Sequence, residues 1–193
     1  MINPLTEYER KLVIDAEVLL AKNKIIQKVV QLFAGLSENY KEALKANHTL
    51  INIASDVKIS KGENYKGLPY LVLDYPRRFG KVDVLAIRTF FWWGNFFSIT
   101  LHLSGEYQEA HFTAIEKAIL KGLLDGWSLG VGDNAWQHHF ETDNYTLIES
   151  GKDYNLSGYP FIKIAKKIPL DKWDDVEAFF EENFIFLIKV IGS

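Results

Sequence analysis

Two aromatic-rich runs joined at Gly94-Asn95 constrain this chain more than any other feature, and together they span residues 82–104. Glycine and asparagine both tolerate the positive φ angles that a tight hairpin turn requires. The sequence therefore predicts a β-hairpin whose turn is centred on these two residues. In that register Trp93 lies opposite Phe96, and the rest of the pairing follows.

The predicted register sorts the hairpin side chains into two faces, because successive strand residues point to opposite sides of a sheet. One face is apolar except for Arg88. The other face mixes aromatic rings with hydroxyls and a histidine, and it contains Trp93, Thr100 and His102. We expect the first face to be core and the second face to line a pocket.

The order of helical and strand patterns predicts one α+β domain over residues 1–193. Its helices pack on a mainly antiparallel twisted sheet of five or more strands. A hydrophobic content of 48% is enough to build a sizeable core at this length. The expected parts are a helical N-terminal part (1–47), a β-meander (48–104), a helix (105–126), further strands (127–167) and a C-terminal helix (169–191).

Local signals set the expected helix boundaries in the N-terminal part. Thr6 and Glu9 match a capping box, in which each side chain bonds the backbone of the other residue. Residues 22–24 are expected to bend or break the helical region. Gly35 and Ser37 indicate the end of one helix and the cap of the next.

Turn and strand signals divide the rest of the chain. Residues 61–64 are typical of a turn, and residues 68–75 of a strand that ends at Pro76, which cannot donate to a sheet ladder. Two later strands are expected around residues 136–140 and 145–149.

Charge and cysteine content exclude several function classes. The chain has no cysteine, which excludes disulfides, cysteine nucleophiles and cysteine-ligated metals. Its net charge of −3 provides no basic field for nucleic acid. No apolar run reaches the roughly 18 residues of a membrane span. We therefore expect a cytoplasmic protein with no nucleic-acid partner and no membrane partner.

The segment Val57-Lys58-Ile59-Ser60-Lys61-Gly62-Glu63-Asn64-Tyr65-Lys66 precedes the meander, and a strand-then-helix unit over residues 159–191 follows later. This layout resembles the uncharacterised bacterial α+β families of the YktB-like type. Those families share an N-terminal helical part, a central antiparallel sheet and a late strand-then-helix unit. The resemblance implies the fold class and a bacterial source, and it implies no activity.

Arg88 is the first candidate site residue, because a buried guanidinium needs an anionic partner. If the 68–75 strand pairs through an even-length loop, Leu71 faces Arg88, whereas a one-residue slip offers Asp74 instead. Asp74 and Asp83 are the nearest acids in the sequence. Arg88 thus either binds an anionic ligand in a pocket, forms a structural ion pair, or extends its charged end to solvent.

Arg77 is the second candidate, since it follows Pro76 and precedes Arg78 in an expected loop. Such a pair either clamps a phosphate or carboxylate by two parallel hydrogen bonds or remains solvated in a turn. We place Arg77 at the rim of the expected pocket.

Histidines are the candidates for proton transfer and metal binding. His102 is the one candidate catalytic residue, as a proton-transfer group beside Thr100. His138 and His139 are adjacent, so on a strand they point to opposite faces. A metal site needs His102, one of these two and Glu149 to assemble in space. Because no metal-ligand spacing appears, we expect no metal and no cofactor.

Two functions remain open from the sequence. The first is a small-molecule binding protein or enzyme, with an anionic ligand held on the sheet by Arg77, Arg88, Trp93, Thr100 and His102. The second is a non-catalytic interaction or oligomerisation module, in which the aromatic hairpin buries against a partner or another copy of the chain. The sequence does not decide whether the protein is an enzyme.

Overall fold

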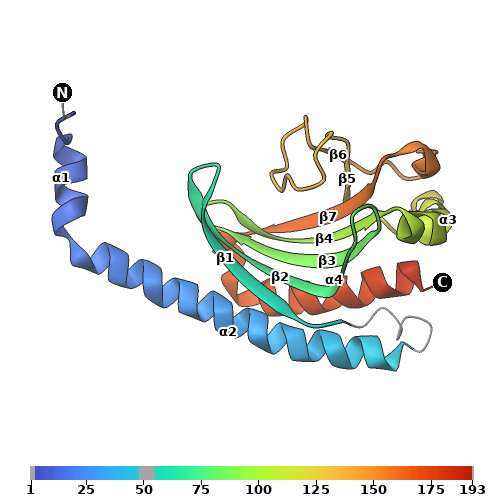
Figure 1. The fold of residues 1–193 in the computed structure, drawn as a ribbon, viewed down its shortest axis with the longest axis horizontal. Helices are drawn as coiled ribbons and strands as arrows, with labels where there is room; N and C mark the ends of the chain where they lie inside the picture. The colour runs from blue at the N-terminus through green and yellow to red at the C-terminus, as the bar shows by residue number, and fades with distance from the viewer. Residues whose placement is uncertain (1–2, 48–54, 193) are drawn as a thin grey trace.

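The structure is a computed structural model that describes residues 3–47 and 55–192. Four α-helices pack with a seven-stranded antiparallel sheet, so the α+β prediction is confirmed (Figure 1). The sheet order is β1-β2-β3-β4-β7-β5-β6. Residues 48–54 of the expected meander lie outside the described residues.

The helices and strands follow the chain in this order: α1 (Glu7–Ile14), α2 (Ala16–Ala46), β1 (Lys58–Tyr65), β2 (Leu68–Phe79), β3 (Val84–Trp92), β4 (Phe96–Ser104), α3 (Glu106–Leu120), β5 (Ser128–Gly130), β6 (Tyr145–Leu147), β7 (Ile162–Pro169) and α4 (Val176–Ile191). Two short 3-10 helices precede β7 and α4, namely η2 (Leu156–Gly158) and η3 (Leu170–Asp175).

The capping box at the start of α1 is confirmed. The Thr6 hydroxyl accepts from the Glu9 backbone N–H at 3.2 Å, and the Glu9 carboxylate accepts from the Thr6 N–H at 2.7 Å. The chain bends between the two helices at Asp15, which ends α1 and caps α2. The break expected at residues 22–24 is therefore wrong.

The helix end expected at Gly35 and Ser37 is also wrong, because α2 continues through both residues. A glycine inside a helix costs only about 1 kcal/mol relative to alanine. The buried apolar stripe of α2, which includes Phe33, Leu36 and Tyr40, outweighs that cost. Ser37 is satisfied within the helix, since its hydroxyl donates to the Ala34 carbonyl at 2.7 Å.

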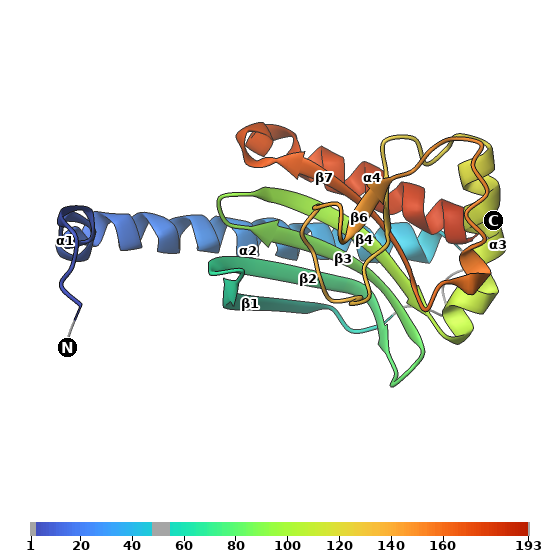
Figure 2. The ribbon, with the colours of Figure 1, turned by 90° about the horizontal axis from the view of Figure 1, so that it is seen from above.

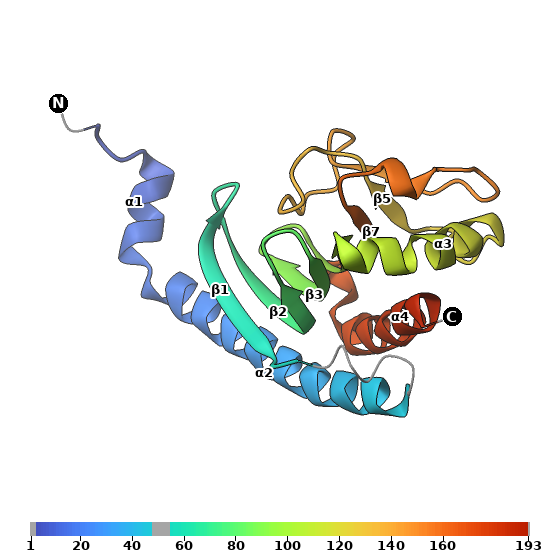
Figure 3. The ribbon, with the colours of Figure 1, turned by 45° about the vertical axis from the view of Figure 1, so that its right-hand side comes forward.

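The main hydrophobic core lies between the sheet and the pair α2 and α4, which cover the same face of the sheet (Figure 3). The Tyr40 ring of α2 stacks on Phe184 of α4 with centroids 3.8 Å apart, and Phe33 meets Phe180 edge-on. The segment of residues 131–144, between β5 and β6, lies over the opposite face of the sheet (Figure 1).

The first half of α2 extends past the edge of the sheet and carries α1 at its end (Figure 2). Large apolar side chains are exposed along this projection, including Tyr8, Val13, Ile14 and Leu19. None of the described helices is both long and apolar enough to cross a membrane.

The predicted hairpin register is wrong by one residue. Trp92, not Trp93, lies opposite Phe96, and Arg88 lies opposite Thr100. A two-residue type I′ turn needs positive φ at both central residues, but only Gly94 of the pair has it, and Trp93 joins the turn. The shift moves one strand's side chains to the other face relative to its partner strand.

The observed register separates apolar from polar side chains between the two faces more completely than the predicted register does. The face toward α2 and α4 is almost entirely apolar, with Phe91, Phe97, Ile99 and Leu101 all buried in the main core. The opposite face brings Arg88, Thr100 and His102 together, because the residues paired across β3 and β4 share a face.

Strand β2 does not end at Pro76, as the sequence predicts, but runs on to Phe79. The β2–β3 pairing shifts by one residue between Asp74 and Arg77, which is a β-bulge that contains Pro76. Proline is tolerated at a bulge because residues there are left out of the ladder. The bulge also turns Asp74 and Arg77, three positions apart, toward the same face, since both line one cleft.

The turn expected at residues 61–64 and the strand expected at residues 136–140 are also wrong. Residues 61–64 belong to β1, and the turn follows at Lys66 and Gly67, both with positive φ. Residues 136–140 form irregular backbone rather than a strand. Tyr65 explains this conformation, because its hydroxyl accepts from the N–H groups of His138 and His139 at 2.7 and 3.1 Å. The backbone of this segment therefore bonds a side chain instead of a neighbouring strand.

Candidate functional site

A cleft of about 410 Å³ opens between the 131–144 segment and the sheet face that α2 and α4 leave uncovered. Strands β1, β2 and β3 form its floor, and Trp136 and His138 contribute from the covering segment. Four aromatic residues line it, namely Tyr65, Tyr70, Phe79 and Trp136. The cleft is thus an aromatic-walled pocket on one face of the sheet.

Arg88 is held in the floor of the cleft by a buried carboxylate. Its Nε donates to Asp74 Oδ1 at 2.8 Å, and its Nη2 donates to Asp74 Oδ2 at 2.9 Å. Asp74 is 4% exposed. Of the alternatives that the sequence leaves open for Arg88, the structure shows the ion pair with Asp74, whereas Leu71 lies opposite Phe91 and not opposite Arg88. The geometry is the bidentate pairing that fits a guanidinium to a carboxylate.

His138 completes the surroundings of Arg88. Its Nε2 lies 3.0 Å from Arg88 Nη1. Because a guanidinium can only donate, Nε2 must accept, and the imidazole is then neutral with its proton on Nδ1. Burial and the nearby Arg88 charge lower the pKa of His138 well below its usual value, in agreement with the neutral form.

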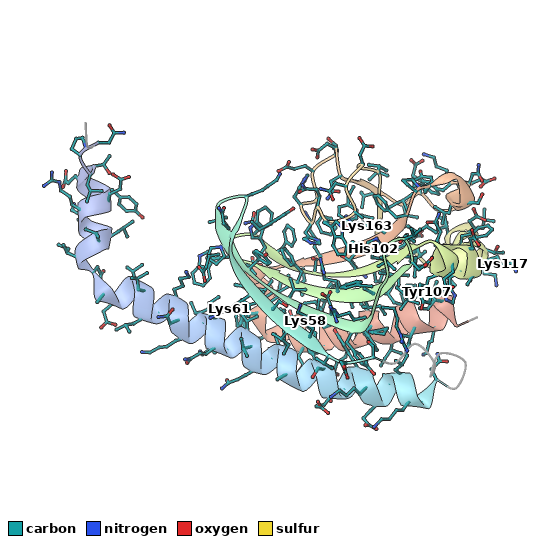
Figure 4. The ribbon with its side chains drawn as sticks, viewed as in Figure 1. Lys58, Lys61, His102, Tyr107, Lys117 and Lys163 are labelled. Carbon is teal, nitrogen blue, oxygen red and sulfur yellow. The ribbon has the colours of Figure 1, made fainter. Side chains whose placement is uncertain are left out.

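A small inner cavity of about 10 Å³ lies beside the cleft, and Thr100, His102 and Lys163 are among the residues that line it. Figure 4 shows His102 and Lys163 on the side of the sheet away from α2 and α4. The Trp136 ring lies edge-on to His102 at 5.4 Å between centroids. Burial, with the charges of Lys163 and Arg88, lowers the pKa of His102 to about 4. His102 is therefore a neutral, enclosed histidine near pH 7.

Lys163 is a buried amine in this cavity, at 1% exposure. Its Nζ donates to the Gln137 carbonyl at 2.5 Å and lies 4.6 Å from the centroid of the Tyr145 ring. Burial, and to a smaller extent the charge of Arg88, lowers the pKa of Lys163 to about 7. Lys163 thus adds a partial positive charge behind the cleft.

Cations outnumber acids among the residues that line the cleft. Lys58, Arg77 and Arg88 are positive, and Asp74 is the one carboxylate among the lining residues. Asp74 is already paired with Arg88. Arg77 packs its guanidinium over the Phe79 ring at 4.9 Å, and its Nε is buried without a hydrogen-bond partner.

The structure distributes the sequence-predicted site residues over three places. Arg77 lines the cleft, Thr100 and His102 line the inner cavity, and Arg88 borders both spaces. Trp93 lies at the hairpin tip against the main core, and it takes no part in either space. Glu149 does not join the histidines, since its carboxylate pairs with Lys152 at 2.8 Å.

Sequence reasoning missed Trp136 and Lys163 as site residues, and it considered His138 only as a possible metal ligand, not as a partner of Arg88. Lys163 carries a usable signal, because it is a single lysine in the apolar run Phe161-Ile162-Lys163-Ile164-Ala165, as Arg88 is in its strand. Trp136 and His138 carry none, because their position depends on the irregular backbone of the covering segment.

Comparison with known proteins finds no matching family model, no similar curated protein and no similar solved structure. The resemblance to the YktB-like families stays a prediction.

Proposed function

We propose that this protein binds a small anionic molecule with an aromatic or apolar part in the cleft beneath the 131–144 segment. The observation that supports this most strongly is the buried, unpartnered Nε of Arg77, in a cleft with three cations and one carboxylate. A buried donor without a partner costs free energy, which an incoming anion would recover.

The charged and aromatic residues of the cleft have different roles in binding the ligand. Asp74 neutralises Arg88 and fixes its orientation. Lys58 and Arg77 then supply the net positive charge that attracts a carboxylate or phosphate. The four aromatic residues offer flat apolar surface to the remainder of the ligand. A volume of about 410 Å³ falls within the usual range for small-molecule pockets.

Binding explains the site better than catalysis by His102. Its cavity of about 10 Å³ is barely large enough for one water molecule. His102 is only 7% exposed and packs edge-on against the Trp136 ring. His102 is better explained as part of the packed support behind Arg88.

The interaction-module hypothesis receives little support from the hairpin, because all of its aromatic residues except the half-buried Trp93 are buried within the chain. Trp92 is 6% exposed, Phe96 is 8% exposed and Phe97 is fully buried. A docking patch would need these rings on the surface.

A thermal-shift experiment with matched probes tests the proposal, because a ligand that binds only the native state raises the melting temperature. The probes are 1-naphthoate with its uncharged amide, and 1-naphthyl phosphate with 1-naphthol. We expect at least one anion to raise the melting temperature and its uncharged counterpart to have little effect. Equal shifts within both pairs, or no shift with either anion, would overturn the proposal.

A further inference from the structure

The covering segment carries a histidine and two carboxylates at alternating positions, His139, Glu141 and Asp143. The His139 Nδ1 atom lies 3.5 Å from Glu141 Oε2 and 3.7 Å from Asp143 Oδ1. One ligand atom from each of the three residues lies within 4.8 Å of the others. We propose that these three side chains bind a divalent transition-metal ion of the Zn²⁺ type.

The state of His139 is an independent reason to expect a ligand here. The residue is 5% exposed, yet its Nδ1 is buried and has no hydrogen-bond partner. Buried polar atoms in proteins are nearly always paired. Nδ1 faces the two carboxylates at distances too long for a hydrogen bond. A cation between the three groups would accept the Nδ1 lone pair and so give this buried nitrogen the partner that it lacks.

The spacing suits a tetrahedral ion. Two ligand atoms at about 2.1 Å from a tetrahedral zinc ion are about 3.4 Å apart. The two distances from Nδ1 are close to that value. One imidazole nitrogen with two carboxylate oxygens favours a borderline transition metal, whereas Ca²⁺ and Mg²⁺ prefer oxygen ligands alone. Water would occupy the remaining position.

The backbone that presents these ligands is already organised. The Tyr65 hydroxyl accepts from the His139 N–H, and the Asn144 side-chain amide donates to the His139 carbonyl at 2.5 Å. The Glu141 carbonyl accepts from the N–H groups of Asn144 and Tyr145 at 3.0 and 2.9 Å. A loop held in this way loses little entropy when it binds a metal.

Lys66 competes with the metal for one of the ligands. Its Nζ lies 3.0 Å from Glu141 Oε2, the same oxygen that faces His139. Metal binding must displace this ammonium group or share the carboxylate with it. Removing the lysine should therefore tighten metal binding, which a purely structural cluster would not show.

The test is Zn²⁺ titration by calorimetry on tag-free, chelator-treated protein, with Co²⁺ as a spectroscopic substitute. We expect one ion per chain and a visible Co²⁺ band typical of tetrahedral coordination. Glu141→Gln and Asp143→Asn alter exposed side chains, so both variants should fold. Each should weaken binding about ten-fold or more. Glu149→Gln, at an exposed acid elsewhere, is the matched control and should bind as wild type does.

Lys66→Gln supplies the second arm, with Lys152→Gln as its control. We expect tighter Zn²⁺ binding only in Lys66→Gln. The proposal is overturned if the wild type binds no stoichiometric ion, if Glu149→Gln loses as much affinity as Asp143→Asn, or if Ca²⁺ binds as tightly as Zn²⁺. Because these readouts use no organic anion, they succeed or fail independently of ligand binding in the cleft.

Discussion

Arg88 on β3 lies directly opposite Asp74 on β2, and the two side chains form parallel hydrogen bonds of 2.8 and 2.9 Å. The Asp74 side chain is 6% exposed and that of Arg88 is 14% exposed. Two charges are therefore shielded from water at the floor of the cleft, and each depends on the other. This pair links the stability of the sheet to the chemistry of the cleft.

Arg88→Met should destabilise the protein by about 3–5 kcal/mol, because it leaves the Asp74 carboxylate buried and unpaired. The double variant Arg88→Met/Asp74→Leu should recover much of this loss, since neither charge remains. Chemical denaturation of the wild type, both single variants and the double variant gives the coupling free energy directly. A single variant as stable as wild type would show that the pair does not support the fold.

The pH dependence of stability should change with Lys163. Its pKa is about 7 in the folded protein against an ordinary 10.5, so the unfolded chain binds more protons between these values. Stability is therefore lost as pH falls from 10.5 toward 7, and it rises with increasing pH over this interval by at most about 1.4 kcal/mol per pH unit.

Denaturation of wild type and Lys163→Met at pH 7, 8 and 9 measures this effect. We expect the wild type to gain stability relative to the variant as pH rises. Lys121→Met removes an exposed lysine and should parallel the wild type. Parallel curves for wild type and Lys163→Met would mean that Lys163 is not a desolvated amine.

Tyr40 should contribute to stability through both its ring and its hydroxyl. The hydroxyl lies 3.1 Å from the Thr89 hydroxyl inside the core, and the ring stacks on Phe184. Tyr40→Phe should cost about 1–3 kcal/mol, because the Thr89 hydroxyl then lacks this partner. Tyr40→Ala should cost about 3–5 kcal/mol, in line with other large-to-small aromatic changes in cores. Tyr8→Phe, at a 70% exposed position, is the control and should leave the denaturation midpoint unchanged.

The fold class and the need of Arg88 for an anionic partner could be predicted from the sequence, because they depend on pattern and on the cost of a buried charge. The identity of that partner could not, because it depends on the register between β2 and β3. The hairpin register could not, because it depends on whether the turn contains Gly94 and Asn95 alone or Trp93 as well, and both choices leave a plausible hairpin. A one-residue difference of this kind exchanges faces for a whole strand. It decides whether Arg88 shares a face with Thr100 and His102.

The cleft itself depends on two irregularities that no periodic pattern contains. The bulge at Pro76 turns Arg77 toward the same face as Asp74. The Tyr65 hydroxyl bonds the covering segment and so places His138 over Arg88. The alternation of His139, Glu141 and Asp143 is typical of a strand or turn, and only the folded loop brings their ligand atoms together.

The central claim is that the cleft recognises an anion through Arg77. Calorimetric titration of wild type, Arg77→Gln and Arg78→Gln with the anionic naphthyl probe that gives the larger thermal shift tests it most directly. Arg78 is exposed and does not line the cleft, so its substitution matches the charge change without touching the site. We predict that Arg77→Gln binds about ten-fold more weakly or worse, as expected for a lost charge-assisted hydrogen bond, while Arg78→Gln binds as wild type does. Equal affinities for wild type and Arg77→Gln would contradict the account.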